Sequence, residues 1–118
     1  MGIAAGSLNR RVRLQHPQQR ENPANEADLE WVEFASAWAS IRHTSGLKAL
    51  IAGADRPIVR ASVRLRYRRD VSMGMRLVHG DDHYVVEAVL PDEDRREYVD
   101  LVCRLLSPRE VESDEAGP

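Results

Sequence analysis

The sequence predicts a mainly β fold, namely a small antiparallel β-barrel or sandwich of five to six strands with one short α-helix and a long loop in the N-terminal half. Three observations predict it. Residues 59–68 alternate between apolar and polar side chains, which is the period of a strand with one buried face. Similar alternation recurs along the 118-residue chain between turn-forming residues. Only one segment has the spacing of a helix.

Length and charge indicate one domain followed by a short tail. A chain of 118 residues is long enough for one modest core. Residues 109–118 carry four acids against one arginine, a net charge of −3, whereas the whole chain carries −2. Residues 1–108 therefore sum to +1, and we expect a single barrel-like domain over 1–108 and a disordered acidic tail over 109–118.

The first strand and the long loop are expected in the first thirty residues. In residues 8–17, Val12 and Leu14 share a parity opposite to the neighbouring arginines. Pro17 is expected to end this strand because proline cannot donate a hydrogen bond to a neighbour. Residues 17–30 contain two prolines and no periodicity, which predicts a long, functional or mobile loop.

The next segment predicts an irregular strand and then the short helix. Residues 31–43 contain both tryptophans and the single phenylalanine. The parity of the apolar residues changes near residues 33–35, which predicts a bend or β-bulge there. Within residues 44–53, apolar side chains recur at helical spacing between a possible cap and a glycine, and this predicts the helix.

The second half of the chain predicts the remaining strands. Residues 57–69 form the most regular alternating run. Residues 75–90 are predicted to form a hairpin with its tip at 80–82. Residues 91–97 are a charged turn, and the alternating residues 98–106 close the domain.

The core follows from the inward parity of these runs together with the largest apolar side chains. The expected core residues are Val12, Leu14, Trp38, Ile41, Leu50, Val63, Leu65, Tyr67, Tyr84, Val86, Val99, Leu101 and Cys103.

Nothing in the sequence points to catalysis. His79 and His83 flank two aspartates, and these are zinc-ligand types, but glycine and aspartate are also what a hairpin tip requires. Cys103 is the single cysteine and lies on an inward parity, as an inert buried thiol does; it forms no intramolecular disulfide, which fits a reducing compartment. We expect no catalytic residues, no metal and no cofactor, and we expect that the chain is not an enzyme. No apolar run approaches the about 20 residues of a membrane span.

In residues 59–68, the side chains expected to point outward are mostly arginines, and none of them is acidic. Arg60, Arg64, Arg66 and Arg68 are the candidates for contact with a partner or with DNA. The face is either an ordinary solvated one or a surface for nucleic acid or for an acidic protein. Tyr67 has the parity of the buried face. A nucleic-acid surface that stacks bases on aromatic rings between the arginines is therefore the less favoured hypothesis.

The order of the segments resembles a known family. "GSLNRRVRLQHP" is followed by a turn-rich loop, "WVEFASAWASIR", "SGLKALIAGADRP", "VRLRYRRDVSMGMRLVHGDDHYVVEAV" and "PDEDRREYVDLVC". This succession is similar to the phage head–tail joining family, the small head–tail adaptor or head-closure proteins of long-tailed bacteriophages and prophages. The resemblance covers about residues 6 to 105 and leaves out the acidic residues from Glu110 onward.

The resemblance implies a structural virion-assembly protein. It implies a ring in the neck that joins the DNA-filled head to the tail and helps to close the head. The implied partners are the portal-side connector ring, a tail-completion or tail-terminator protein and genomic DNA that passes through the ring without sequence preference. The chain would be a monomer in isolation and a homo-oligomeric ring on assembly, in the bacterial host cytoplasm and then in the virion neck, with no membrane partner. The loop residues that would make ring contacts are Arg20, Glu21, Asn22, Asn25 and Glu26.

A second reading stays open beside this one. The arginine-rich strand of a small β-barrel also suits a nucleic-acid-binding module. Such a module would bind DNA as an isolated chain, with an affinity that falls steeply as salt rises.

Overall fold

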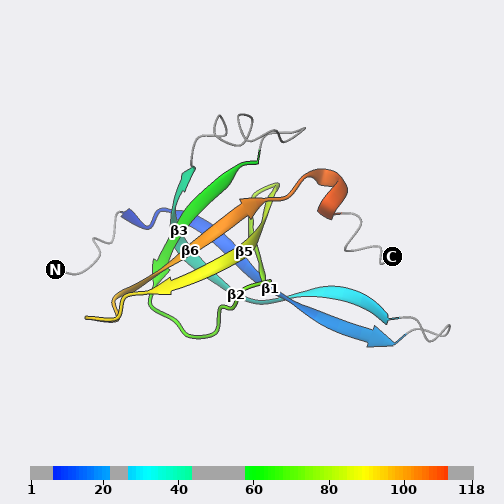
Figure 1. Cartoon of the computed structure of the whole chain (residues 1–118), viewed down its shortest axis with the longest axis horizontal. Helices are drawn as coiled ribbons and strands as arrows, with labels where there is room; N and C mark the ends of the chain where they lie inside the picture. The colour runs from blue at the N-terminus through cyan, green and yellow to red at the C-terminus, as the bar shows by residue number, and fades with distance from the viewer. Residues whose placement is uncertain (1–6, 22–26, 44–57, 112–118) are drawn as a thin grey trace.

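The fold is built from six antiparallel strands (Figure 1). The structure, a computed structural model, describes residues 7–21, 27–43 and 58–111. The helix expected within 44–53 lies outside these residues, as does Leu50 of the expected core. The strands are β1 (Arg10–Glu21), β2 (Ala27–His43), β3 (Arg60–Arg66), β4 (Arg76–His79), β5 (Asp82–Pro91) and β6 (Tyr98–Leu105).

The strands close into a barrel in the order β1-β2-β3-β6-β5-β4. Closure depends on a short pairing of β1 with β4, in which Arg13 faces Val78 and Gln15 faces Arg76. The sequence allowed a barrel or a sandwich, and the structure forms the barrel. A barrel buries the apolar face of each strand inside and leaves few open strand edges. No helix among the described residues is long and apolar enough to cross a membrane.

The inward residues fill the barrel as the alternation predicts. Ala39, Ala61 and Leu77 are also fully buried there, and Ile41 is half-buried against this cluster. Small barrels are filled by side chains in this way. The expected core residues that are buried are Val12, Leu14, Val63, Leu65, Tyr84, Val86, Val99, Leu101 and Cys103.

Two of the expected core residues lie outside the core cluster. Trp38 is 52% exposed, because it alternates with buried Ala39 and therefore points outward from β2. Tyr67 is half-buried and follows the last residue of β3, so the strand's inward parity does not apply to it. Placing both in the core was wrong, and both belong to the surface described below.

The predicted bulge lies at Phe34. In the β1–β2 pairing, Leu14 faces Ala35 while Gln15 faces Glu33, so Phe34 is the extra residue on β2. An extra residue on one strand bends the pair and increases its twist. The bulge lies where β1 pairs with β4 for the last time, at Gln15. It confirms the irregularity expected near residues 33–35.

Beyond the bulge, β1 and β2 leave the barrel as a two-stranded arm, residues 16–21 and 27–32 (Figure 1). The prediction of a loop over 17–30 was wrong for its two ends, which pair from Pro17 with Trp31 to Glu21 with Ala27. Residues 22–26 lie outside the described residues. Apart from Trp31 at its base, over which Arg76 stacks, the strands of the arm pair only with each other among the described residues. With no face against the core, the arm needs no apolar alternation. Pro17 is tolerated because β1 has no second neighbour here, and proline is compatible with an edge.

The hairpin of β4 and β5 forms at the predicted tip. His79 pairs with Asp82, so Gly80 and Asp81 are the two loop residues. Gly80 has a φ of 60°, which is the backbone conformation that a two-residue II′ turn requires at its first central position. Among the described residues, no group of three or more histidine, cysteine or acidic side chains is placed to hold a metal ion.

A single helical turn, residues 108–111, follows β6. The Ser107 Oγ accepts from the N–H of Glu110 at 3.2 Å, and the Glu110 carboxylate accepts from the N–H of Ser107 at 3.1 Å. This is a capping box with Pro108 at the first helical position. The hydrogen bond from the Ser107 backbone and a second from Arg104 lower the pKa of Glu110. The first residues of the acidic tail are therefore helical, and those from 112 onward lie outside the described residues.

Candidate functional site

The arginines that alternate along β3 meet acids from the neighbouring strands. Arg64 faces Asp100 of β6 and donates to both of its carboxylate oxygens, at 2.7 and 2.9 Å. Its guanidinium also stacks over the Tyr98 ring, 3.9 Å from the centroid. The hydrogen bond to Asp100 raises the pKa of Arg64. This arginine is held in place by its own subunit.

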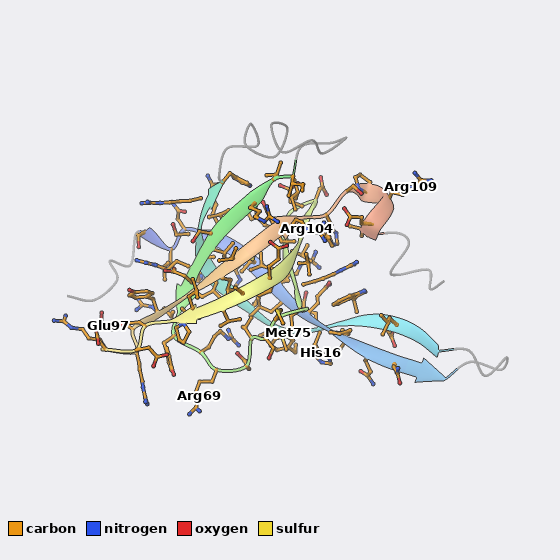
Figure 2. All side chains as sticks on the ribbon, viewed as in Figure 1. His16, Arg69, Met75, Glu97, Arg104 and Arg109 are labelled. Atoms are coloured by element: carbon orange, nitrogen blue, oxygen red, sulfur yellow. The ribbon has the colours of Figure 1, made fainter. Side chains whose placement is uncertain are left out.

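Arg60 belongs to a chain of charges on the same face. It faces Arg104 of β6, and Glu87 compensates both cations: the carboxylate lies 2.9 Å from Arg60 and 3.6 Å from Arg104. Arg104 also lies 3.0 Å from Glu110 of the helical turn. Glu87 is the extra residue of the bulge between Val86 and Ala88 on β5. The network connects three strands and the helical turn, close to the labelled Arg104 (Figure 2).

Arg68 is also compensated, whereas Arg66 is not. Arg68 donates to both carboxylate oxygens of Asp70, at 2.6 and 2.8 Å, and this pairing lowers the pKa of Asp70. Arg66 is exposed and makes no hydrogen bond or ion pair with any residue that the structure describes. Exposed ion pairs add at most about 1 kcal/mol to stability, so their main effect is to cancel charge. The face is a mixed-charge surface, and of the four candidate arginines Arg66 is the one without a partner among the described residues.

A groove of about 370 Å³ lies beside Arg66. The Trp38 indole forms part of it, and Arg11 of β1 stacks over that ring at 5.3 Å from the centroid while donating to Ser36 at 2.7 Å. Aromatic surface and a free guanidinium are therefore adjacent on the outer side of β1, β2 and β3. The groove is lined by Leu8, Ala37, Trp38, Arg66, Tyr67 and Arg68.

The arm carries the other candidate residues. Arg20 and Glu21 lie in β1, opposite Asp28 and Ala27 of β2. Asn22, Asn25 and Glu26 lie outside the described residues. Leu29 is 41% exposed on the arm, and the adjacent Glu30 is exposed as well. Because successive strand residues point to opposite sides, the arm presents the apolar side chain on one face and the carboxylate on the other.

The sequence analysis placed Trp38 in the core, although the alternation of residues 37–41 already indicates that it lies on the surface. Trp38 shares a parity with Ser40, and Ala39 and Ile41 take the inward positions. The strand period alone therefore places the indole outside. The general tendency of tryptophan toward the interior is overridden by register.

The Arg64 pair yields a test of this geometry. Arg64→Glu puts two carboxylates against each other, and we expect the free energy of unfolding to fall by about 1 kcal/mol, a modest value because the pair is partly solvated. Combining it with Asp100→Arg is expected to recover most of the loss, and Arg66→Glu is expected to leave stability unchanged. Urea unfolding of the four proteins measures this. A loss that the swapped pair does not recover would contradict a direct interaction.

Comparison with known proteins places this chain in a family. The family model described as phage head completion protein matches residues 3–106. The solution structure of protein SF1141 from Shigella flexneri 2a superposes with a TM-score of 0.66 at 24% identity, over 90% of this chain and 99% of that one. A chain in the virion of a native gene transfer agent particle superposes with a TM-score of 0.65 at 18% identity, over 84% and 96%.

No curated protein matches the chain. The two solved structures show the same fold, and the family model covers the whole barrel and arm, from before β1 to the end of β6. The family resemblance inferred from the order of the motifs is thus confirmed, and nothing in the comparisons supports a nucleic-acid-binding module. The chain belongs to the phage head completion protein family and is a structural protein of virion assembly.

Proposed function

We propose that this head completion protein forms a ring in the neck of a tailed phage or prophage particle, where it closes the DNA-filled head and joins it to the tail. The observation that carries the proposal is the arm, which leaves a closed barrel and whose strands, among the described residues, pair only with each other (Figure 1). Strands with open edges and exposed apolar side chains invite contact with another chain. A barrel with a projecting arm suits a subunit that must touch several neighbours.

The proposed neighbours are the portal-side connector ring, a tail-completion or tail-terminator protein and the DNA that passes through the ring. The role is one of assembly without catalysis, first in the bacterial host cytoplasm and then in the virion neck. Compensation of Arg60, Arg64 and Arg68 by acids leaves little free charge on β3 for phosphates. The proposed contact with the DNA that passes through the ring is non-specific.

The deciding experiment deletes the gene for this chain from an inducible phage or prophage and examines the lysate by negative-stain electron microscopy. We expect separate heads and finished tails, with some heads losing DNA, and restoration of joined particles by the full chain supplied in trans. Joined, DNA-filled particles in the deletion lysate would overturn the proposal. Supply of an unrelated small barrel protein in trans is the matched control.

A further inference from the structure

A polar pocket of about 200 Å³ lies on the outer face of β2 and β3. The described residues that line it are Ser7, Ser40, Arg42, Ser62, Arg64 and Asp100. All of these side chains except that of Asp100 carry hydrogen-bond donors, and none of them is apolar. The volume is sufficient for a small oxyanion together with water. The pocket therefore has the lining that a polar, negatively charged ligand requires.

The register of β2 and β3 arranges the arginines and serines of the pocket as a checkerboard. Arg42 pairs with Ser62 across the sheet, and two residues along, Ser40 pairs with Arg64. All four point outward, because Val63, which separates Ser62 from Arg64 on β3, is buried inside the barrel. The two arginines occupy one diagonal, about 7–8 Å apart at the backbone. The short serine side chains on the other diagonal leave the space between the two guanidinium groups open.

Most donors of the pocket are unused. Arg42 is exposed and makes no hydrogen bond or ion pair with any residue that the structure describes. The hydroxyls of Ser40 and Ser62 also have no hydrogen-bond partner among the described residues. Arg64 donates two of its five N–H groups to Asp100, which leaves three. Both strands therefore supply donors to a ligand that lies between them.

The net charge of the pocket indicates the charge of its ligand. Asp100 compensates Arg64 in a bidentate pair, so Arg42 is the remaining cation and the lining carries a net charge of +1. This charge matches an anion of charge −1. A planar carboxylate is satisfied by one guanidinium, as Asp100 is by Arg64. A phosphate group is tetrahedral and accepts hydrogen bonds from several directions, which fits two arginines and two hydroxyls around one space.

We propose that this pocket binds a phosphate group of charge −1, held between the guanidinium groups of Arg42 and Arg64 and by the hydroxyls of Ser40 and Ser62. The backbone of the DNA that passes through the proposed ring is one source of such a group, and free phosphate is another. Arg42 of β2 supplies the charge that the compensated arginines of β3 lack. The site is formed by a single chain, so the inference does not depend on the neck ring.

The test follows the arginine Nε–H signals and the backbone amides of the ¹⁵N-labelled full chain by NMR at low salt. Dimethyl phosphate, a phosphate diester with one negative charge, is expected to shift the signals of Arg42, Arg64, Ser40 and Ser62 in a saturable way. Acetate, which has the same charge, is expected to bind about tenfold more weakly. Arg42→Gln is expected to weaken the binding of dimethyl phosphate about tenfold, the effect of losing one charge-assisted hydrogen bond.

Two further variants separate the pocket from a general attraction by positive charge. Ser62→Val keeps every charge but removes a hydroxyl and fills the pocket, and we expect it to abolish saturable binding; valine suits an exposed strand position such as this one. Arg69→Gln is the matched control for Arg42→Gln, because Arg69 is an exposed arginine that points away from the barrel (Figure 2), and we expect an unchanged affinity. Unaltered binding by Ser62→Val, equal binding of acetate, or the absence of saturable shifts would overturn the inference.

Titrations with a short DNA duplex and with inorganic phosphate identify the source of the group. Shifts of the same signals by the duplex, weakened in Arg42→Gln, would assign the site to the DNA backbone. Shifts by inorganic phosphate without shifts by the duplex would assign it to free phosphate. Binding of neither would overturn the inference. All of these results are independent of whether the deletion lysate contains joined particles.

Discussion

Replacing Leu65 with alanine is expected to lower the free energy of unfolding by about 2–5 kcal/mol. Leu65 is fully buried near the end of β3, between Ala39 of β2 and Val99 of β6. In a closed barrel the neighbouring strands are fixed by pairing on both sides, so the cavity left by the missing side chain collapses poorly. Urea unfolding followed by tryptophan fluorescence measures the change.

Trp38→Ala is the matched control, since Trp38 is larger than Leu65 and lies beside it, on the outer face of the adjacent strand. We expect a loss of about 1 kcal/mol or less because the indole is already half in water. Circular dichroism serves as the probe for this variant, which lacks one of the two tryptophans. Equal losses for the two variants would mean that Trp38 supports the fold rather than an interface.

Replacing Arg76 with glutamate is expected to cost about 3–5 kcal/mol. Arg76 is only 1% exposed, and its guanidinium stacks over the Trp31 ring at 4.2 Å from the centroid. It faces Gln15 at the pairing that closes the barrel, where the arm begins. A buried carboxylate in this place would lose the cation–π contact and gain a desolvation cost.

Arg76→Met separates charge from volume, and its loss is expected to be much smaller because methionine replaces the apolar stem without burying an anion. Arg69→Glu, on an exposed arginine, is the control for the charge change. Besides urea unfolding, hydrogen exchange of the arm residues is expected to rise in Arg76→Glu. A stable Arg76→Glu protein with a protected arm would show that the arginine does not hold the arm.

The sequence by itself was sufficient for the parts of the fold that depend on local periodicity. Val63 and Leu65, like Val99 and Leu101, are inward because successive residues of a strand point to opposite sides. The break of parity near Phe34 identified the bulge, since one extra residue inverts the alternation of all that follow. Family membership also followed from the order of such local segments.

Only the tertiary structure determines which side chain of a neighbouring strand each outward residue contacts. Arg64 is compensated because β6 lies beside β3 and brings Asp100 opposite it, although the two residues are far apart in sequence. Arg66, two residues away on the same strand, has no such partner among the described residues. The sequence of the arm predicts a loop because its strands lack apolar alternation. Pro17 does not interrupt β1, since at this position β1 pairs with β2 on one side and has no neighbour on the other. The physical reason is that alternation is a property of one strand, whereas register, strand order and closure are set by contacts between strands.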